Sequence, residues 1–250
     1  MLVLGLQGSP RKKGNTNFLL ETFMTAAGNI GAQTHIVDCT RKNIIPCKEY
    51  VVCEKKGFCP IEDDVRDEIY PLLRQAEVVV IATPIFFYNM TAQLKAVIDR
   101  CQTFWARKYK LKLRDPGANM RRGFLLAVGA TRGKNLFEGL NLTTQYFFDA
   151  IGAKFEGSLT YRGIEGPKDM AGHPTVQEDV EKAVHGILQP FSGRQKVLFA
   201  CRENACRSQM ASAFAQSLAG DTLEVFNAGS EPAAKVHPDM LTVMHEKGID

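Results

Sequence analysis

Short apolar runs alternate with stretches of helical period along most of the chain. The apolar runs predict strands at Leu2–Gln7, Thr34–Asp38, Val78–Thr83, Gly123–Val128 and Lys154–Tyr161. Between them, apolar residues recur at helical spacing near Asn17–Asn29, Asp63–Arg74, Ala92–Phe104, Asn135–Ile151 and Val176–Leu188. A run such as 78–82, apolar at every position, indicates a strand buried on both faces, which is typical of a parallel sheet. The pattern therefore predicts a doubly wound α/β domain with a five-stranded parallel sheet over residues 1–188.

A second, shorter α/β pattern follows residues 189–194, which we interpret as a linker. It consists of a strand at 196–200, a helix over Ser208–Leu218, a strand over Thr222–Phe226, a turn at 227–230 and a helix over Pro238–Lys247. We expect residues 195–250 to form a partial βαβα unit. Its first strand lacks a neighbour on one edge, and so few residues bury little surface. We therefore expect this unit to pack on the first unit or on a partner chain, or to be partly mobile.

Composition excludes several classes of protein. Of the 250 residues, 45% are hydrophobic and the net charge is only +4, which indicates a folded core rather than disorder. No apolar run approaches the ~18 residues of a membrane span, and the chain begins as a strand rather than as a signal peptide. The basic residues between Arg107 and Arg122 come without a nucleic-acid-binding motif, so we expect no nucleic-acid partner. Seven cysteines, an odd count, fit a reducing cytoplasm.

The loop after the first strand carries the donors that a phosphate group needs. A strand that delivers free backbone N–H groups to a helix N-terminus favours binding of a dianion. In a doubly wound sheet the loop after the third strand borders the same site, and here it is aromatic and apolar, which suits a flat ring. The loop after the fourth strand can close over that ring. The candidate cofactor-binding residues are Ser9, Arg11, Asn15, Thr16, Asn17, Pro84, Ile85, Phe86, Phe87, Tyr88, Asn89, Gly129 and Ala130.

These residues also carry a family resemblance. The segments Gly8–Arg11 with Gly14–Thr16, Pro84–Phe86 and Leu94–Arg100 resemble the NADPH-dependent FMN reductase family, and its iron–sulfur flavoprotein branch most closely. The resemblance covers about residues 1–188. It implies a flavodoxin-like fold, non-covalently bound FMN and a homodimer or homotetramer. Because the chain lacks the third glycine of a dinucleotide fingerprint, we expect NAD(P)H to bind transiently as a co-substrate.

Cys47, Cys53 and Cys59 lie where the iron–sulfur flavoproteins have a compact four-cysteine motif. These three match cysteine positions of the motif, whereas Tyr50 stands at the fourth. A [4Fe–4S] cluster is held by four thiolates. Two interpretations remain: a degenerate metal site completed by a ligand from elsewhere, or a loop without a cluster whose cysteines pack as small hydrophobes, which we favour. We interpret Cys39 and Cys101 as buried core residues.

The second unit opens with a Cys-x5-Arg pattern from Cys201 to Arg207, between a strand and a helix. A cysteine at a helix N-terminus beside an arginine has a lowered pKa, so Cys201 is a candidate nucleophile and Arg207 a candidate oxyanion ligand. With the Asn227–Ser230 segment, the pattern resembles low-molecular-weight phosphatases and arsenate reductases. The resemblance covers only residues 195–250. The general-acid aspartate and the later cysteines of those enzymes lie further downstream than this sequence reaches.

Together these patterns predict an FMN-dependent NAD(P)H oxidoreductase with an appended arsenate reductase-like segment and an unidentified electron acceptor. One alternative is an arsenate reductase or phosphatase acting through Cys201, with the flavin domain as its source of reductant. Another is an electron-transfer flavoprotein that receives electrons from a ferredoxin. Bound flavin, NADPH oxidation without oxygen and Cys201-dependent hydrolysis distinguish these three.

Overall fold

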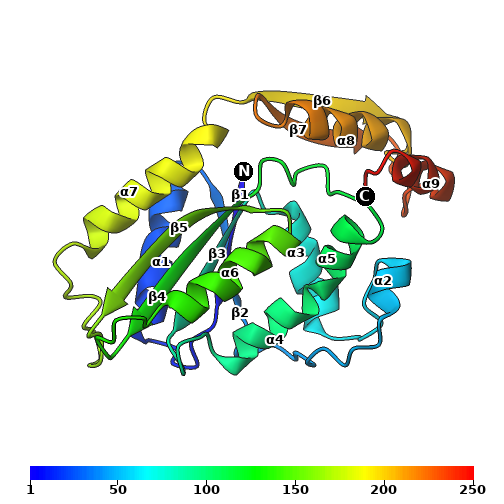
Figure 1. The fold of residues 1–250 in the computed structure, drawn as a ribbon. Helices are drawn as coiled ribbons and strands as arrows, with labels where there is room; N and C mark the ends of the chain where they lie inside the picture. Colours follow the sequence, from blue (N-terminus) through cyan, green and yellow to red (C-terminus); the bar gives the residue numbers. More distant parts are fainter.

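The computed structural model describes residues 1–250 and contains two parallel sheets (Figure 1). The larger sheet has the strand order β2-β1-β3-β4-β5. This is the order of flavodoxin-like proteins, so the predicted fold class is confirmed. Its strands are β1 (Leu2–Gln7), β2 (Gln33–Asp38), β3 (Val78–Pro84), β4 (Arg122–Gly129) and β5 (Lys154–Arg162).

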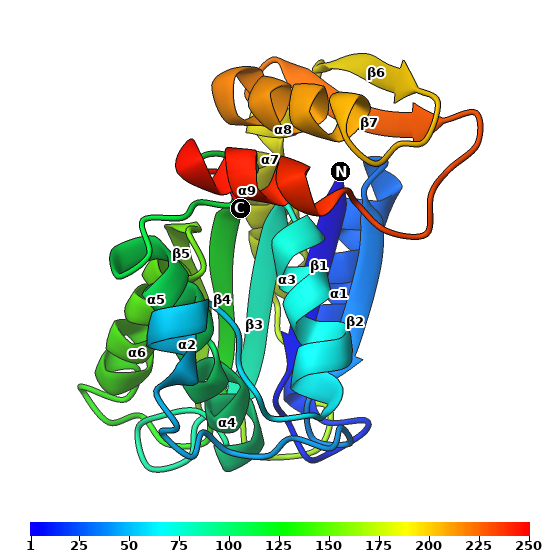
Figure 2. The same cartoon turned by 90° about the vertical axis from the view of Figure 1, so that its right-hand side faces the viewer.

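Helices cover both faces of this sheet (Figures 1 and 2). On one face lie α1 (Asn15–Asn29) and α7 (Val176–Leu188). On the other lie α3 (Tyr70–Gln75), α4 (Ala92–Arg100), α5 (Gln102–Tyr109) and α6 (Glu138–Ala150). Successive residues of a strand point to opposite faces, so Val79 and Ile81 enter one core while Val78 and Val80 enter the other. Two separate cores explain why the central strands β1, β3 and β4 are apolar at nearly every position, whereas the edge strands β2 and β5 are more polar.

Several elements differ from the prediction. The helix expected over 63–74 begins as a π-helical turn, η1 (Val65–Ile69), before α3. The helix expected over 92–104 is two helices, because the backbone N–H of Cys101 bonds to both Val97 O and Ile98 O and interrupts the regular ladder. A short helix, α2 (Val52–Lys56), had not been expected.

The second unit contains β6 (Gln195–Cys201), α8 (Arg207–Ala219), β7 (Leu223–Gly229) and α9 (Pro238–Glu246). The prediction of a turn from residue 227 is wrong, because pairing with β6 continues to Cys201 and Gly229. Glycine is required at position 229, at the end of β7, because a Cβ there would lie only 2.6 Å from the carbonyl oxygen of Arg202. A small core around Met240, Met244 and Ile249 belongs to this unit alone.

The second unit packs against the amino-terminal edge of the larger sheet (Figures 1 and 2). It is joined to α7 by a 3-10 turn, η2 (Gln189–Phe191), whose Phe191 belongs to the core beneath α1. Arg194 pairs with Glu77, which precedes β3, and the amino group of Met1 lies 2.7 Å from Glu224. The expectation that the unit packs on the first domain is therefore confirmed.

No helix in residues 1–250 has both the length and the hydropathy that a membrane span requires.

Candidate functional site

The loop after β1 is held in place by the side chain that ends the strand. Gln7 is buried, and its amide accepts a hydrogen bond from the backbone N–H of Ser9 and donates to Ser9 O at 3.1 Å. The next residue must be small: a Cβ on Gly8 would lie 2.8 Å from Leu94 Cδ2 and 3.2 Å from Ala82 O. Gln7 and Gly8 therefore fix the path of the loop against β3 and α4.

A second contact ties this loop to the loop after β3. Thr91 is buried and donates through Oγ1 to Gly8 O at 2.6 Å. Thr91 N in turn donates to Thr83 Oγ1 at 3.4 Å. The two loops therefore border one cleft of about 330 Å³ at the carboxyl ends of β1, β3 and β4. This is the position where ligands bind in doubly wound sheets.

The N-terminus of α1 opens into this cleft with unpaired backbone donors. Gly14 occupies the N-cap position and provides no side-chain cap, and the first turn carries no acidic residue. An uncapped helix of 15 residues presents free N–H groups and the positive end of its dipole. The lining adds polar side chains, among them Ser9, Arg11 and Thr16. The chemistry of these donors fits a phosphate monoester.

Only part of the predicted ring-binding segment faces the cleft. Pro84, Ile85 and Phe86 line it, and Ala130 lines it from the loop after β4. Gly129 lies just behind, since a Cβ there would be 3.6 Å from Ile85 Cγ1.

The rest of that segment points away from the cleft. Phe87 is fully exposed, and Asn89 donates to Thr143 Oγ1 of α6 at 3.1 Å. Tyr88 reaches towards Gly133, where a Cβ would lie 3.3 Å from the Tyr88 hydroxyl.

Two predicted phosphate ligands are engaged with the protein itself. Asn15 donates to Gly166 O at 2.9 Å and accepts from Met170 N at 3.1 Å. It therefore holds the loop after β5 beside the cleft. Asn17 donates to Glu21 Oε1 at 2.7 Å and does not line the cleft.

Sequence reasoning missed the loop after β5. Ile164 and Glu165 line the cleft, and Ile164 N donates to Gly129 O at 3.0 Å. The available signal was Gly163 and Gly166 directly after a strand, a spacing that marks a turn at the carboxyl edge. Gln7 was missed because its role is visible only once its contacts with Ser9 are seen.

The cysteine loop, residues 46–60, is fixed at its base by a buried ion pair. Arg100 and Asp63 are both fully buried and lie 2.5 Å apart. Arg100 also donates to Ile45 O at 2.8 Å and to Ile61 O at 3.4 Å, so one guanidinium holds both ends of the loop.

The three cysteines of this loop are not gathered at one point. No three His, Cys, Asp or Glu side chains converge on a point where a metal ion fits. Cys47 is exposed, whereas Cys53 and Cys59 are half-buried. The expectation that all three pack as small hydrophobes is therefore wrong for Cys47. The residues present do not fit a four-thiolate cluster. Cys39 and Cys101 are buried, as expected.

Cys201 ends β6 inside a hydrogen-bonded loop. Its Sγ lies 3.0 Å from Ser208 Oγ, which is 2.8 Å from Asn204 Oδ1. Asn204 adopts φ +49° and donates to Asn227 Oδ1 at 3.0 Å, which fixes the loop against the end of β7. Arg207 is exposed at the first position of α8.

This environment favours the thiolate of Cys201. The hydrogen bond from the Ser208 hydroxyl, followed by the backbone N–H of Ser208, lowers the pKa of Cys201 to about 7. Backbone N–H groups of Asn204 and Glu203 add to the effect. Burial has the opposite effect on Cys39 and raises its pKa to about 12. Cys201 is the cysteine that the fold activates.

The second unit, which carries Cys201, lies at the edge of the larger sheet where the strands begin (Figures 1 and 2), whereas the cleft lies at the edge where they end. The cleft opens where β1, β3 and β4 end, whereas the second unit contacts Met1 and Glu77, where β1 and β3 begin. A six-residue strand spans about 20 Å, which separates the two edges. The Cys201 loop therefore does not open into the cleft of its own chain.

A doubly wound sheet with an uncapped helix N-terminus and an apolar wall in one cleft at its carboxyl edge defines a flavodoxin-like protein. Residues 1–142 match the NADPH-dependent FMN reductase family, and the chain belongs to that family. An iron–sulfur flavoprotein of Archaeoglobus fulgidus is 34% identical over 205 residues, which cover 77% of this chain and all of that protein. The NAD(P)H:quinone oxidoreductase of Methanothermobacter marburgensis has the same fold, with a TM-score of 0.57 and 17% identity over 75% of this chain and 96% of that one.

The second unit has relatives of its own. Residues 196–250 match the low molecular weight phosphotyrosine protein phosphatase family. A glutaredoxin arsenate reductase of Synechocystis is 45% identical over 56 residues, which cover 22% of this chain and 42% of that protein. The chain thus spans less than half the length of this relative.

Proposed function

We propose that the protein is an FMN-dependent oxidoreductase that accepts a hydride from a reduced nicotinamide. The observation that supports this most directly is the cleft itself. An uncapped helix N-terminus and Ser9, Arg11 and Thr16 lie at one end of it, and Pro84, Ile85 and Phe86 lie along its wall. A phosphate donor set next to an apolar slot matches the two ends of FMN.

FMN supplies the chemistry of accepting two electrons as a hydride and passing them on singly or in pairs. The protein's residues have simpler tasks. The N–H groups of α1, with Ser9 and Thr16, hold the phosphate dianion, and Arg11 adds positive charge at the rim. Ile85 and Phe86 exclude water from one side of the ring. The backbone at Gly129 and Ala130 lies beside the polar edge of the ring slot, and the other face stays open for a nicotinamide.

The test of this site is a glycine substitution with a matched control. Gly8→Ala introduces a Cβ that collides with Leu94 and Ala82 O, so we expect FMN affinity to fall at least tenfold. Gly28→Ala changes α1 at a position with no atom within 4 Å and should leave FMN affinity unchanged. Fluorescence titration of FMN measures both. A purified protein that is colourless and takes up no FMN would overturn the proposal.

We further propose NAD(P)H as the electron donor, a homodimer or homotetramer as the working form, and the cytoplasm as its location. All seven cysteines are free, which is the usual state in a reducing compartment. Oxidation of NADPH or NADH by the FMN-loaded protein without oxygen tests the donor, and light scattering tests the assembly. Reduction by a ferredoxin but by neither nucleotide would favour the electron-transfer alternative.

A second candidate function belongs to Cys201. Its activated thiol receives hydrogen bonds from the Ser208 hydroxyl and from backbone N–H groups of the loop, and Arg207 closes the same Cys-x5-Arg segment, a combination typical of sites that bind tetrahedral oxyanions. We propose that residues 195–250, beyond the 189–194 linker, hold an oxyanion such as phosphate or arsenate here. Activity on p-nitrophenyl phosphate or arsenate that is lost in Cys201→Ser would support this. Activity retained in that variant would exclude it.

A further inference from the structure

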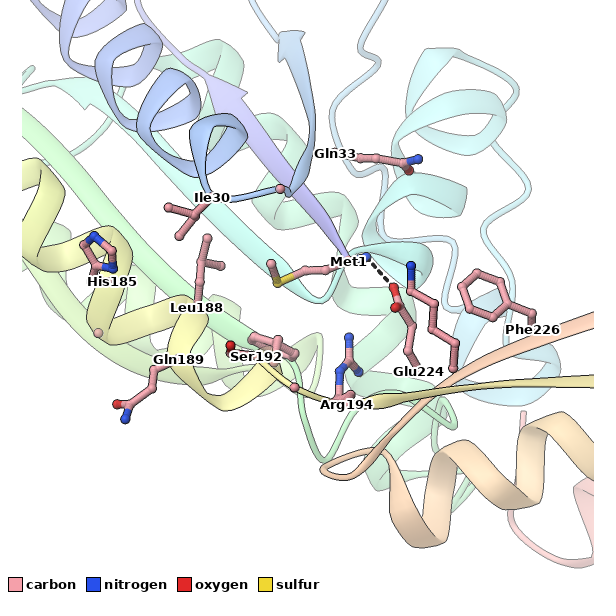
Figure 3. Close-up of a pocket in the computed structure, with 15 residues that line it drawn as sticks. Met1, Ile30, Gln33, His185, Leu188, Gln189, Ser192, Arg194, Glu224 and Phe226 are labelled. Carbon is pink, nitrogen blue, oxygen red and sulfur yellow. Dashed lines mark hydrogen bonds and ion pairs between the residues drawn. The ribbon is translucent and has the colours of Figure 1, made fainter.

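A cavity of about 910 Å³ lies between the two units, away from both loops described above (Figure 3). The corner between α1 and β2 and the end of α7 form one wall, with Ile30, Gln33 and Leu188. Arg194, Lys196 and Phe226 contribute to the other wall from the linker and the β6–β7 sheet. Neither the FMN cleft nor the Cys201 loop shares any of these residues.

The cavity faces the uncovered side of the β6–β7 sheet. Lys196 and Leu198 lie on the same face of β6, and their neighbours on β7 are Glu224 and Phe226. Leu198 is 61% exposed and Phe226 is 44% exposed. Parallel sheets normally have both faces covered. Here the first domain lies opposite this face, and Ile30, itself 43% exposed, stands across the gap.

The polar part of the cavity carries more positive than negative charge. Three cationic groups, the Met1 amine, Arg194 and Lys196, meet two carboxylates, Glu224 and Glu77. The Met1 amine pairs with Glu224, and Arg194 pairs with Glu77. Lys196 is exposed and is left without a close ion pair.

Arg194 supplies an unused donor at the same place. Its side chain is only 6% exposed, and Nη1 donates to Gly220 O at 3.2 Å. Its Nε is buried and has no partner. Buried donors are nearly always paired, so Arg194 retains hydrogen-bonding capacity that no protein group uses. With the net positive charge of the three cationic groups, this capacity favours an anionic group in the cavity.

We propose that this interdomain cavity binds an amphiphilic organic anion. Its carboxylate or sulfonate-like group lies at Lys196 and Arg194, and its apolar part packs between Ile30, Leu188 and Phe226. The volume falls within the ~300–1,000 Å³ typical of small-molecule sites, which often lie at domain interfaces. Because the two units each form one wall, the ligand also strengthens their docking.

The experiment titrates 8-anilinonaphthalene-1-sulfonate, an aromatic sulfonate, into FMN-saturated protein by calorimetry. We expect one molecule per chain. Lys196→Glu should raise Kd at least tenfold, whereas Lys235→Glu, which reverses an exposed charge outside the cavity, should change it less than twofold. Ile30→Ser should raise Kd at least threefold, whereas Leu198→Ser, on the same sheet face but outside the lining, should not.

A second readout locates the probe between the units. Saturating probe should slow tryptic cleavage of the wild-type linker at Arg194 at least threefold. The proposal is overturned by the absence of a saturable single site, by equal Kd values for the Lys196 and Lys235 variants, or by binding that leaves linker cleavage unchanged. Because every lining residue lies outside the FMN cleft, the result is independent of the flavin proposal.

Discussion

The Cys201 thiol differs from the other cysteines in what surrounds it. Its sulfur lies 3.0 Å from the Ser208 hydroxyl, and its pKa is lowered to about 7. We expect the rate of alkylation by iodoacetamide to rise with pH and to reach half its maximum near pH 7. Ser208→Ala removes the main stabilising hydrogen bond and should move that midpoint up, towards the ordinary value of a thiol. Mass spectrometry of the modified peptide measures the rate.

Cys39 serves as the internal control for this measurement. It is buried, and its raised pKa of about 12 predicts no alkylation below pH 9 in the folded protein. A midpoint that stays the same in Ser208→Ala would show that the hydroxyl does not activate the sulfur.

Asp63 and Arg100 are the buried charges that organise the cysteine loop. Burial alone would raise the pKa of Asp63, but hydrogen bonds from Arg100 and from the backbone of Ile45 and Arg66 outweigh it and lower the pKa. The stabilisation is thus present above the ordinary pKa of an aspartate and is lost as the pH falls through the lower, folded value.

Asp63→Asn should therefore destabilise the protein markedly at neutral pH. It leaves Arg100 buried without a counter-charge, which costs about 3–5 kcal/mol. Asp99→Asn removes an exposed ion pair with Lys95 and should cost no more than about 0.5 kcal/mol. Urea unfolding at pH 7 compares them. Similar losses in both variants would contradict the role given to the buried pair.

Among the elements at the cleft, the turn from Phe86 to Asn89 is the most strained. Phe87 and Tyr88 both have positive φ, +47° and +62°, although neither is glycine. Paired hydrogen bonds between Phe86 and Asn89 close the turn. Such a two-residue turn favours asparagine or glycine at its centre.

Phe87→Asn should relieve part of this strain. Because the Phe87 side chain is fully exposed and makes no packing contact, the substitution should raise stability by about 0.5–1 kcal/mol. FMN affinity should change less than twofold, whereas Phe86→Ala, which alters the lining, should lower it clearly. Thermal unfolding and FMN titration test both statements. Loss of FMN binding in Phe87→Asn would show that Phe87 contacts the cofactor.

The same segment shows how far the sequence alone could lead. The central strands β1, β3 and β4 were predictable because burial on two faces requires apolar residues at nearly every position. The edge strands β2 and β5 are more polar and were predictable from their place in the alternation of strands and helices. The loops at the cleft were predictable from strand order and local chemistry. The contacts of individual side chains were not: Asn15 lines the cleft but is bonded to the distant Gly166, and Phe87 is turned to solvent by the tight turn between Phe86 and Asn89. The extension of β7 likewise depends on pairing with β6 rather than on local propensity.

At the scale of the whole molecule, the separation of the two sites limits what one chain can do. The cleft lies at the carboxyl edge of the sheet, and the unit that carries Cys201 lies at the amino edge. Electrons delivered from a flavin to the Cys201 site would therefore have to pass through another molecule or another copy of the chain. This geometry favours treating the two sites as independent.

The docking of the second unit is mainly polar. Its small core does not merge with the two cores of the first domain, and its contacts include the Arg194–Glu77 pair and the Asp250 carboxylate between Arg74 and Arg107. Removing one partner of a partly buried ion pair leaves the other charge uncompensated and destabilises the contact, and salt weakens the attraction between exposed charges.

Glu77→Gln should therefore loosen the second unit while the first stays folded. We expect cleavage of the 189–195 segment to quicken at least fivefold in limited proteolysis, and more so in 0.5 M salt, while FMN binding is retained. Glu231→Gln breaks the exposed Arg202–Glu231 pair within the second unit and should leave cleavage unchanged. Restored resistance to chymotrypsin, whose site at Phe191 is kept, in a Glu77→Arg, Arg194→Glu double variant would confirm that charge pairing across the junction holds the units together. Equal cleavage of wild type and Glu77→Gln would instead assign the docking to the remaining contacts around Asp250.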